Sequence, residues 1–245
     1  MMIDQSGMEK KYKTSISVII PVYNDYNSIN STFKVIHDFL DDNFMEWEII
    51  IIESGSTDGT TQLVDEIAGR FSNTTVFHQA KREGMGSAMK LGYSKCTNEL
   101  VWKIVPDLPF DLKNIHRAMP CFPDLDYVYS YRINDRRSIK RRLMTLVYNV
   151  IIRKVLRLSV RHVNSSFIVL KRNVIDQIDI KSDGWFYQAE LLSELKKKEY
   201  AFSEIPVSFL PRQKGRSTVS LITSLGVLKE MVSYLFKFYF VNILQ

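Results

Sequence analysis

Three short polar segments follow directly on apolar runs and carry residue types that can bind a polar ligand. The segments are residues 21–25, 53–60 and 105–107. Asp25 and Glu53 can accept hydrogen bonds from hydroxyl or imide groups, and Pro21 and Tyr23 can form the wall of a slot beside them. A buried carboxylate is selective, because a ligand that lacks those groups leaves it unpaired. The alternative is that Pro21 only ends a strand and Tyr23 only packs.

Two further segments indicate phosphate chemistry. Arg212, Lys214 and Arg216 crowd one short loop that also contains Gly215 and Ser217. Cations gathered around a glycine make a phosphate cradle, although a solvated basic turn has the same composition.

Gly84 and Gly86 precede an expected helix. A helix start of this kind can let the backbone approach a phosphate or a sugar, but a glycine pair is a weak signal.

The elements that must position these segments alternate regularly. Apolar runs predict strands over 16–20, 48–52, 75–77 and 100–105, and helical spacing predicts helices over 27–40, from 56 or 57 to about 71, and over 87–95. This alternation implies parallel strands with right-handed crossovers. In such sheets ligands bind beyond the carboxyl ends of the strands, which is where the three polar segments lie. Ser56, Thr57 and Asp58 are expected to cap the second helix and so to support their loop.

The second half of the chain is less regular. It predicts strands near 127–129 and 166–170, a basic helix-like stretch over 136–158, a helix over 185–197, and a segment 201–207 that leads into the basic loop 211–217. We predict an α/β fold with a Rossmann-like, mostly parallel sheet flanked by helices. Residues 1–14 are expected to be a disordered lead-in, 15–218 one domain, and 219–245 an amphipathic helical tail.

The charge is unevenly distributed. The 245 residues carry a net charge of +6, and nine Lys/Arg but no Asp or Glu fall between Arg136 and Arg161. Such a patch suits lipid headgroups, a phosphorylated substrate or nucleic acid, and no nucleic-acid-binding motif accompanies it. Cys96 and Cys121 show no metal-like spacing, and the four histidines form no cluster in the sequence.

Two stretches predict contact with a membrane. Apolar residues recur at helical spacing within 136–161, among the basic residues, and again in the tail. Such segments can lie in a headgroup layer, or they can cover the sheet or form a dimer seam. The N-terminus lacks the apolar core of a signal peptide, and no stretch reaches the ~18 uncharged apolar residues of a spanning helix. We therefore expect a cytoplasmic protein, peripheral at the inner face of the membrane.

Six pieces in this order resemble family-2 glycosyltransferases with a GT-A-like fold. They are ISVIIPVYN from Ile16, ESGSTDGT from Glu53, REGMGSA from Arg82, FYQAE from Phe186, EIP from Glu204 and RQKGRS from Arg212. The last three are similar to the polyprenyl-phosphate, dolichol-phosphate mannosyltransferase-like branch. The resemblance covers roughly residues 15–218.

The resemblance implies transfer of a sugar, with inversion, from a UDP- or GDP-sugar to a membrane-associated acceptor. A polyprenyl phosphate is the favoured acceptor, and a glycan is the alternative. The donor-binding residues would be Pro21, Tyr23, Asn24, Asp25, Glu53 and Gly84. A lipid phosphate is already anionic and attacks without a base, whereas a hydroxyl acceptor needs one, for which Glu190 or Asp107 are the candidates. Arg212 would act in catalysis, and Lys214, Arg216 and Ser217 would bind the acceptor phosphate.

Asp107 stands where the family places its metal-binding Asp-x-Asp element, which holds Mg²⁺ or Mn²⁺ against the leaving diphosphate. Here the first position is Val105. Ser54 replaces a second Asp of the earlier loop, residues 162–167 depart from the branch pattern, and Thr218 replaces a Lys. These departures leave open a catalytically impaired binding or partner subunit. A nucleotidyltransferase is disfavoured, because no glycine-rich loop follows the first strand. A homodimer also remains open.

Overall fold

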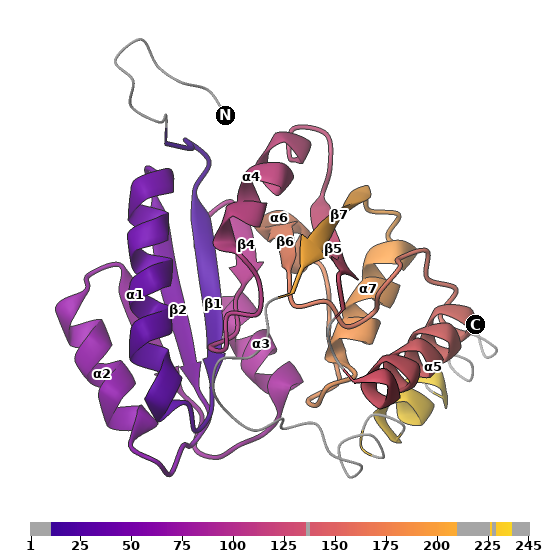
Figure 1. The fold of residues 1–245 in the computed structure, drawn as a ribbon, viewed down its shortest axis with the longest axis horizontal. Helices are drawn as coiled ribbons and strands as arrows, with labels where there is room; N and C mark the ends of the chain where they lie inside the picture. The colour runs from indigo at the N-terminus through magenta and orange to yellow at the C-terminus, as the bar shows by residue number, and fades with distance from the viewer. Residues whose placement is uncertain (1–10, 136–137, 210–225, 227–228, 237–245) are drawn as a thin grey trace.

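The computed structural model describes residues 11–135, 138–209, 226 and 229–236. Within them, seven strands form one sheet in the order β3-β2-β1-β4-β6-β5-β7 (Figure 1). The strands are β1 (Ile16–Val22), β2 (Trp47–Glu53), β3 (Thr74–His78), β4 (Leu100–Lys103), β5 (Tyr127–Ile133), β6 (Ile168–Lys171) and β7 (Phe202–Ser208). β6 is antiparallel to both of its neighbours, and every other neighbouring pair is parallel. The prediction of a mostly parallel sheet is confirmed.

Helices cover both faces of the sheet. The longer ones are α1 (Tyr26–Asn43), α2 (Thr60–Arg70), α3 (Met85–Lys95), α5 (Ile139–Val155) and α7 (Tyr187–Lys197), and the short ones are α4 (Ile115–Ala118) and α6 (Arg172–Ile175). Short 3₁₀ turns, Leu112–Asn114 and Met119–Cys121, flank α4. α1 and α2 pack on one face, and α3 and α7 pack on the other. In the part of the chain that the structure describes, no helix has the length and apolarity to cross a membrane.

The isoleucine run in β2 fits a strand that is covered on both faces. Ile49 and Ile51 join the core on the side of α1, whereas Ile50 and Ile52 join the core on the side of α3. All four side chains are buried, and each contributes about 2 kcal/mol of hydrophobic stabilisation. A central parallel strand therefore reads as a continuous apolar run.

Pro21 lies inside β1, and the prediction that the strand stops before it is wrong. The Ile19 carbonyl accepts from the Ile104 N–H, and the Val22 carbonyl accepts from the Ser54 N–H. Because successive backbone groups alternate sides, the missing N–H of Pro21 faces the β4 side, beyond the last bond to β4. The proline therefore costs no ladder hydrogen bond.

Other boundaries also differ from the predictions. α2 begins at Thr60, with Gly59 before it at φ 91°, so residues 56–58 lie in the loop. β4 ends at Lys103, and residues 202–208 form a full strand beside β5. Tyr12 exchanges backbone hydrogen bonds with Asn43 and Met45. The predicted lead-in is therefore too long, because residue 12 already belongs to the domain.

α5 lies where the basic helix-like stretch was predicted, and it leaves much of its apolar surface uncovered. Its exposed apolar side chains are Ile139, Leu143, Met144, Leu146, Val147, Val150 and Ile151. Residues 229–236 of the tail are helical and lie beside α5 in Figure 1. The rest of the predicted tail lies outside the described residues.

Candidate active site

The loops that follow β1 and β2 are tied to each other by side chains. The backbone N–H of Asn24 donates to Ser56 Oγ at 3.0 Å, and Thr57 N donates to Asn24 Oδ1 at 2.8 Å. Asp25 N donates to Thr60 Oγ1 at 3.0 Å. Asn24 also adopts φ 53°, a left-handed conformation that asparagine tolerates. The supporting role predicted for residues 56–58 fits this geometry, although they act in the loop and not inside the helix.

Tyr23 and Asp25 line the edge where β1 ends. Asp25 Oδ2 accepts from the Tyr23 N–H at 3.1 Å, so this carboxylate already shapes the turn. The Arg82 guanidinium lies over the Tyr23 ring, 4.3 Å from its centroid. Arg82 precedes α3, so this contact brings a cation from a third loop to the same edge of the sheet.

Glu53 is the buried carboxylate of the site. Its side chain is 2% exposed, Oε1 accepts from Ser56 N at 2.6 Å, and Oε2 lies 3.2 Å from His78 Nδ1. Burial alone would raise the pKa of Glu53, but the hydrogen bonds from Ser56 and His78 outweigh it and hold the pKa below its ordinary value. Glu53 is therefore ionised at neutral pH, and its two oxygens hold Ser56 and His78 at the end of β2.

His78 was missed by the sequence analysis. It ends β3, and its Nε2 lies 2.9 Å from Asp65 Oδ1. Desolvation would lower the pKa of His78, but its bonds to Glu53 and Asp65 raise the pKa overall. Its position at the end of a predicted strand could have indicated a site residue, because the carboxyl ends of parallel strands lie together.

The loop after β4 carries Asp107 and Val105 in a tight turn. Leu108 N donates to the Val105 carbonyl at 3.0 Å, and Thr32 Oγ1 on α1 donates to the Pro106 carbonyl at 2.7 Å. Within the described residues no group of three His, Cys, Asp or Glu side chains is placed to hold a metal ion. Asp107 alone is a weak ligand set for Mg²⁺ or Mn²⁺, so the diphosphate of a donor would have to supply further oxygens.

Lys103 was also missed. It ends β4, two residues before Val105, and is 4% exposed. Its Nζ donates to Tyr187 Oη and to Gln188 Oε1, both at 3.1 Å. Burial lowers the pKa of Lys103 to about 7. The detectable signal was a single lysine inside an apolar strand sequence.

Gly84 and Gly86 start α3 against the backbone of residues 182–184. A Cβ on Gly84 would lie 2.4 Å from the Asp183 carbonyl oxygen, and Gly84 adopts φ +118°. The N–H of Gly86 donates to the Gly184 carbonyl at 3.1 Å. This packing accounts for both glycines, and it occupies an amide that a phosphate would need. We therefore assign a packing role to both glycines, and the donor-binding role of Gly84 stays a prediction.

Replacing Gly84 by Ala is expected to lower the free energy of unfolding by about 3 kcal/mol, from backbone strain and overpacking together. Urea unfolding measures the difference. Gly69→Ala is the matched control, because Gly69 lies inside α2 and a Cβ there meets no atom within 4 Å. This control should raise stability by about 0.5–1 kcal/mol. Wild-type stability in Gly84→Ala would remove the packing explanation.

Glu190 is buried on α7 and not on the helix surface. Oε1 accepts from Lys181 N at 2.9 Å, and Oε2 accepts from Ser182 N at 2.8 Å. Both carboxylate oxygens thus order the segment before α7. A general base needs an oxygen that reaches the acceptor hydroxyl, and the role of Glu190 as a base stays a prediction.

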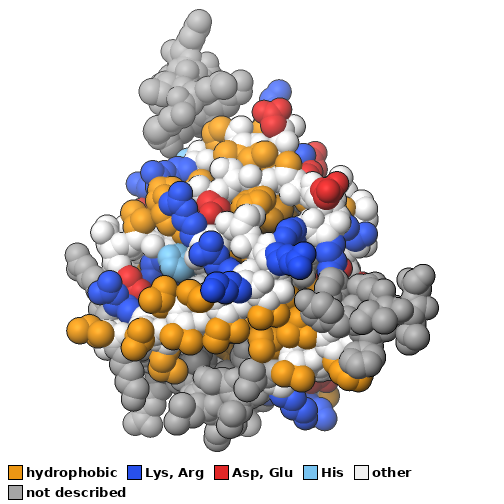
Figure 2. All heavy atoms as spheres, turned by 90° about the vertical axis from the view of Figure 1, so that its right-hand side faces the viewer, with side chains coloured by type: hydrophobic (Ala, Val, Ile, Leu, Met, Phe, Trp, Pro, Cys, Tyr) orange, Lys and Arg blue, Asp and Glu red, His pale blue; other side chains and the backbone are white. Residues whose placement is uncertain are grey.

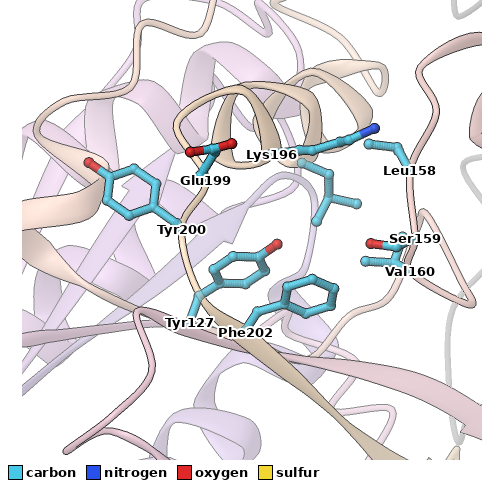
Figure 3. Close-up of a pocket in the computed structure, with 9 residues that line it drawn as sticks. Tyr127, Leu158, Ser159, Val160, Lys196, Glu199, Tyr200 and Phe202 are labelled. Carbon is cyan, nitrogen blue, oxygen red and sulfur yellow. The ribbon is translucent and has the colours of Figure 1, made fainter.

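Two hollows lie near β5 and β7, at opposite ends of these strands. One, at the starts of β5 and β7, is lined by Tyr127, Leu158, Ser159, Val160, Leu192, Lys196, Glu199, Tyr200 and Phe202 (Figure 3). β5 and β7 run in the same direction as β1 and β2. This hollow therefore lies at the amino ends of the strands, whereas Glu53 lies at their carboxyl ends. The second is lined by Arg132, Thr145, Asn149, His162, Asn164, Ser165 and Phe209. It lies at the carboxyl ends of β5 and β7 and includes residues of α5. Arg212, Lys214, Arg216 and Ser217 lie outside the described residues.

The fold and the sequence together define the class of protein. A model of the family described as Glycosyl transferase family 2 matches residues 17–179. The chain belongs to this family, its sheet has the GT-A arrangement, and the predicted resemblance is confirmed.

Two curated relatives are more specific. The glycosyltransferase AglD of Haloferax volcanii is 25% identical over 218 residues, which is 84% of this chain but only 34% of AglD. The dolichyl-phosphate beta-glucosyltransferase ALG5D of Trichomonas vaginalis is 23% identical over 243 residues, covering 89% of this chain and 72% of the relative.

Solved structures share the fold. Glucosyl-3-phosphoglycerate synthase of Mycobacterium tuberculosis, in complex with Mn²⁺, UDP and glucosyl-3-phosphoglycerate, matches 90% of this chain and 79% of its own with a TM-score of 0.66 at 18% identity. Mannosyl-3-phosphoglycerate synthase of Rubrobacter xylanophilus matches 91% and 74% with a TM-score of 0.68 at 16% identity.

Proposed function

We propose that this protein transfers a sugar, with inversion, from a UDP- or GDP-sugar to a polyprenyl phosphate at the inner face of a membrane. The observation that carries the proposal is Glu53, a buried ionised carboxylate at the end of β2, held between Ser56 and His78. The dolichyl-phosphate relative supports the acceptor class.

The donor base and ribose would lie across the linked loops after β1 and β2. Glu53 and Asp25 would accept their N–H and O–H groups, and Tyr23 under Arg82 would form the wall. Because these loops are already held by hydrogen bonds between Asn24 and residues 56–57, little ordering entropy is lost when the donor binds.

The acceptor would approach from the other side of the edge. The second hollow contains Arg132 and two α5 residues, Thr145 and Asn149. An anionic lipid phosphate fits a cation next to a helix with an exposed apolar surface. Its oxygen attacks without a base, which agrees with the engagement of Glu190 by backbone amides.

The remaining roles rest on the sequence. Arg212 would stabilise the leaving diphosphate, and Lys214, Arg216 and Ser217 would bind the acceptor phosphate. Asp107 would hold Mg²⁺ or Mn²⁺ together with donor oxygens, and the ion would neutralise the leaving group.

A second candidate is a catalytically impaired binding or partner subunit. Val105 at the metal position favours it. Ser54 favours it less, because its hydroxyl donates to Gln79 Oε1 at 2.8 Å and thereby supports the loop.

Calorimetric titration with UDP and GDP, each with and without Mn²⁺, tests the donor site. We expect one nucleotide to bind. Glu53→Gln should weaken its binding at least tenfold, because glutamine carries no charge and has one acceptor oxygen in place of two. Asp107→Asn should lower sugar transfer to a polyprenyl phosphate about 100-fold. Binding without turnover on either donor would favour the impaired subunit, and no binding of either nucleotide would refute the donor site.

A further inference from the structure

The tail helix over residues 229–236 is bound to α7 along one side. Tyr234 Oη donates to Glu194 Oε1 at 2.8 Å and also lies within hydrogen-bond distance of Ser193 Oγ, at 3.1 Å, and Met231 is buried. Val232 and Phe236 are 56% and 60% exposed. The helix therefore has one side in the domain and one side in solvent, next to the exposed surface of α5.

Glu230 inserts its carboxylate into the segment before α7. Oε1 accepts from Gly184 N at 2.6 Å, and Oε2 accepts from Phe186 N at 3.1 Å. A Cβ on Gly184 would lie 2.4 Å from Glu230 Oε1, so any side chain at 184 would displace the Glu230 carboxylate. Two charge-assisted bonds of this kind hold the segment in one conformation.

The same segment completes the start of α3. The Gly184 carbonyl accepts from Gly86 N at 3.1 Å, and the Asp183 carbonyl accepts from Ser87 N at 3.0 Å. A helix start leaves its first amides without intrahelical partners. Residues 183–184 therefore supply partners that the sequence of α3 does not.

α3 in turn reaches the candidate active site. Gln79 Nε2 donates to Ser87 Oγ at 2.9 Å, and Gln79 Oε1 accepts from Ser54 Oγ at 2.8 Å. Gln79 N also donates to the Glu53 carbonyl at 2.8 Å. Hydrogen bonds thus run without interruption from Glu230, through residues 183–184 and α3, to the residue beside Glu53.

We propose that Glu230 is a positioning residue for the donor site, and that it couples the solvent-facing tail helix to the loop after β2. The ligand at that loop rests on the proposed function, but the coupling itself does not. The Glu230 carboxylate binds backbone amides, and residues 183–184 bind the start of α3 through backbone bonds, so a shift at Glu230 moves the start of α3 and, through the Ser87 side chain, Gln79.

Hydrogen exchange of the whole protein, without any ligand, tests the coupling. In Glu230→Ala we expect about tenfold faster exchange in residues 181–186, and also in 83–88 and 54–57, with β1 and β2 unchanged. Glu230→Gln, which keeps one acceptor oxygen, should give an intermediate effect and serves if the alanine variant does not fold. Val232→Ala on the exposed side of the same helix is the matched control and should exchange like the wild type.

Faster exchange confined to 181–186 and 229–236 would overturn the proposal, as would a uniform increase that includes β1 and β2. UDP and GDP titrations of the same variants give a second readout, in which Glu230→Ala should weaken binding about tenfold. If the wild type binds neither nucleotide, the proposed function fails while the exchange result still decides the coupling.

Discussion

Replacing Leu143 and Leu146 together by glutamate should weaken binding of the protein to anionic vesicles by about 100-fold. Both side chains are 59% exposed on α5. Figure 2 faces the side of the molecule where α5 lies and shows a row of apolar side chains with Lys and Arg side chains beside it. Withdrawing two leucines from lipid removes about 3 kcal/mol, and each tenfold change corresponds to about 1.4 kcal/mol.

The basic residues of the same region argue for a lipid surface over a protein partner. Arg142, Lys154 and Arg157 are exposed on or just after α5, and no acidic residue falls between 136 and 161. Each basic residue near an anionic headgroup adds about 1 kcal/mol. Binding should therefore fall with rising salt and with the fraction of neutral lipid, while the apolar contribution remains.

Val35→Glu with Met45→Glu is the matched control. These two side chains are 50% and 67% exposed and lie on or after α1, away from α5. The control adds the same charge and removes similar apolar area, so it should retain wild-type co-sedimentation with vesicles of phosphatidylglycerol and phosphatidylcholine. Equal loss in both variants would refute a localised surface. If the wild type and the control are dimers without lipid and the α5 variant is a monomer, the surface is a homodimer interface.

The fold could be predicted from the sequence because the first half of the chain shows clear local patterns of apolar residues. Apolar runs such as that of β2 and the helical spacing of α1 each specify an element, and their alternation specifies parallel pairing. β7 was missed because a strand whose residues are only partly buried carries a weaker pattern. The end of β1 was predicted wrongly at Pro21. A strand tolerates proline where no neighbouring strand needs its N–H, and where β4 ends depends on the tertiary structure.

The candidate site was predictable only to the level of loops. The sequence predicted that residues 21–25 and 53–60 meet, because each segment follows a parallel strand and the carboxyl ends of parallel strands lie together. The sequence did not predict that the Glu190 side chain points inward, or that Glu230 binds the tail helix to the domain. Helical spacing places Glu230 opposite the apolar side chains, which suggests solvent, whereas its partners are backbone amides of residues far away in sequence. Backbone amides leave no sequence signal.

Lys103→Met should raise the free energy of unfolding at pH 7 by about 2 kcal/mol. Among the described contacts of Lys103 there is no carboxylate, and its Nζ bonds only Tyr187 Oη and Gln188 Oε1. Burial lowers the pKa of Lys103 to about 7, against roughly 10.4 in an unfolded chain. The difference corresponds to a penalty on the order of 4 kcal/mol at neutral pH, and loss of two hydrogen-bond donations offsets about half of the gain.

The pH dependence has a defined sign. Between pH 7 and about 10, the unfolded chain holds a proton on this lysine that the folded chain does not, so wild-type stability should rise with pH across that window. In Lys103→Met this rise should be lost. Urea unfolding at pH 7 and pH 9.5 measures it, with the exposed Lys154→Met as control. An identical pH dependence in wild type and Lys103→Met would contradict the buried charge.

The network around Lys103 gives a reason to keep a lysine that lowers stability. Gln188 Nε2 donates to Tyr129 Oη at 2.7 Å, and Tyr129 Oη accepts from Ser165 N at 3.0 Å. Ser165 lines the hollow that also contains Arg132. Lys103 therefore links the end of β4, which leads to Asp107, with the proposed acceptor side. Lys103→Met should lower the rate of sugar transfer even as it raises stability, since residues kept against stability are often kept for function. Unchanged transfer in the more stable variant would refute that role.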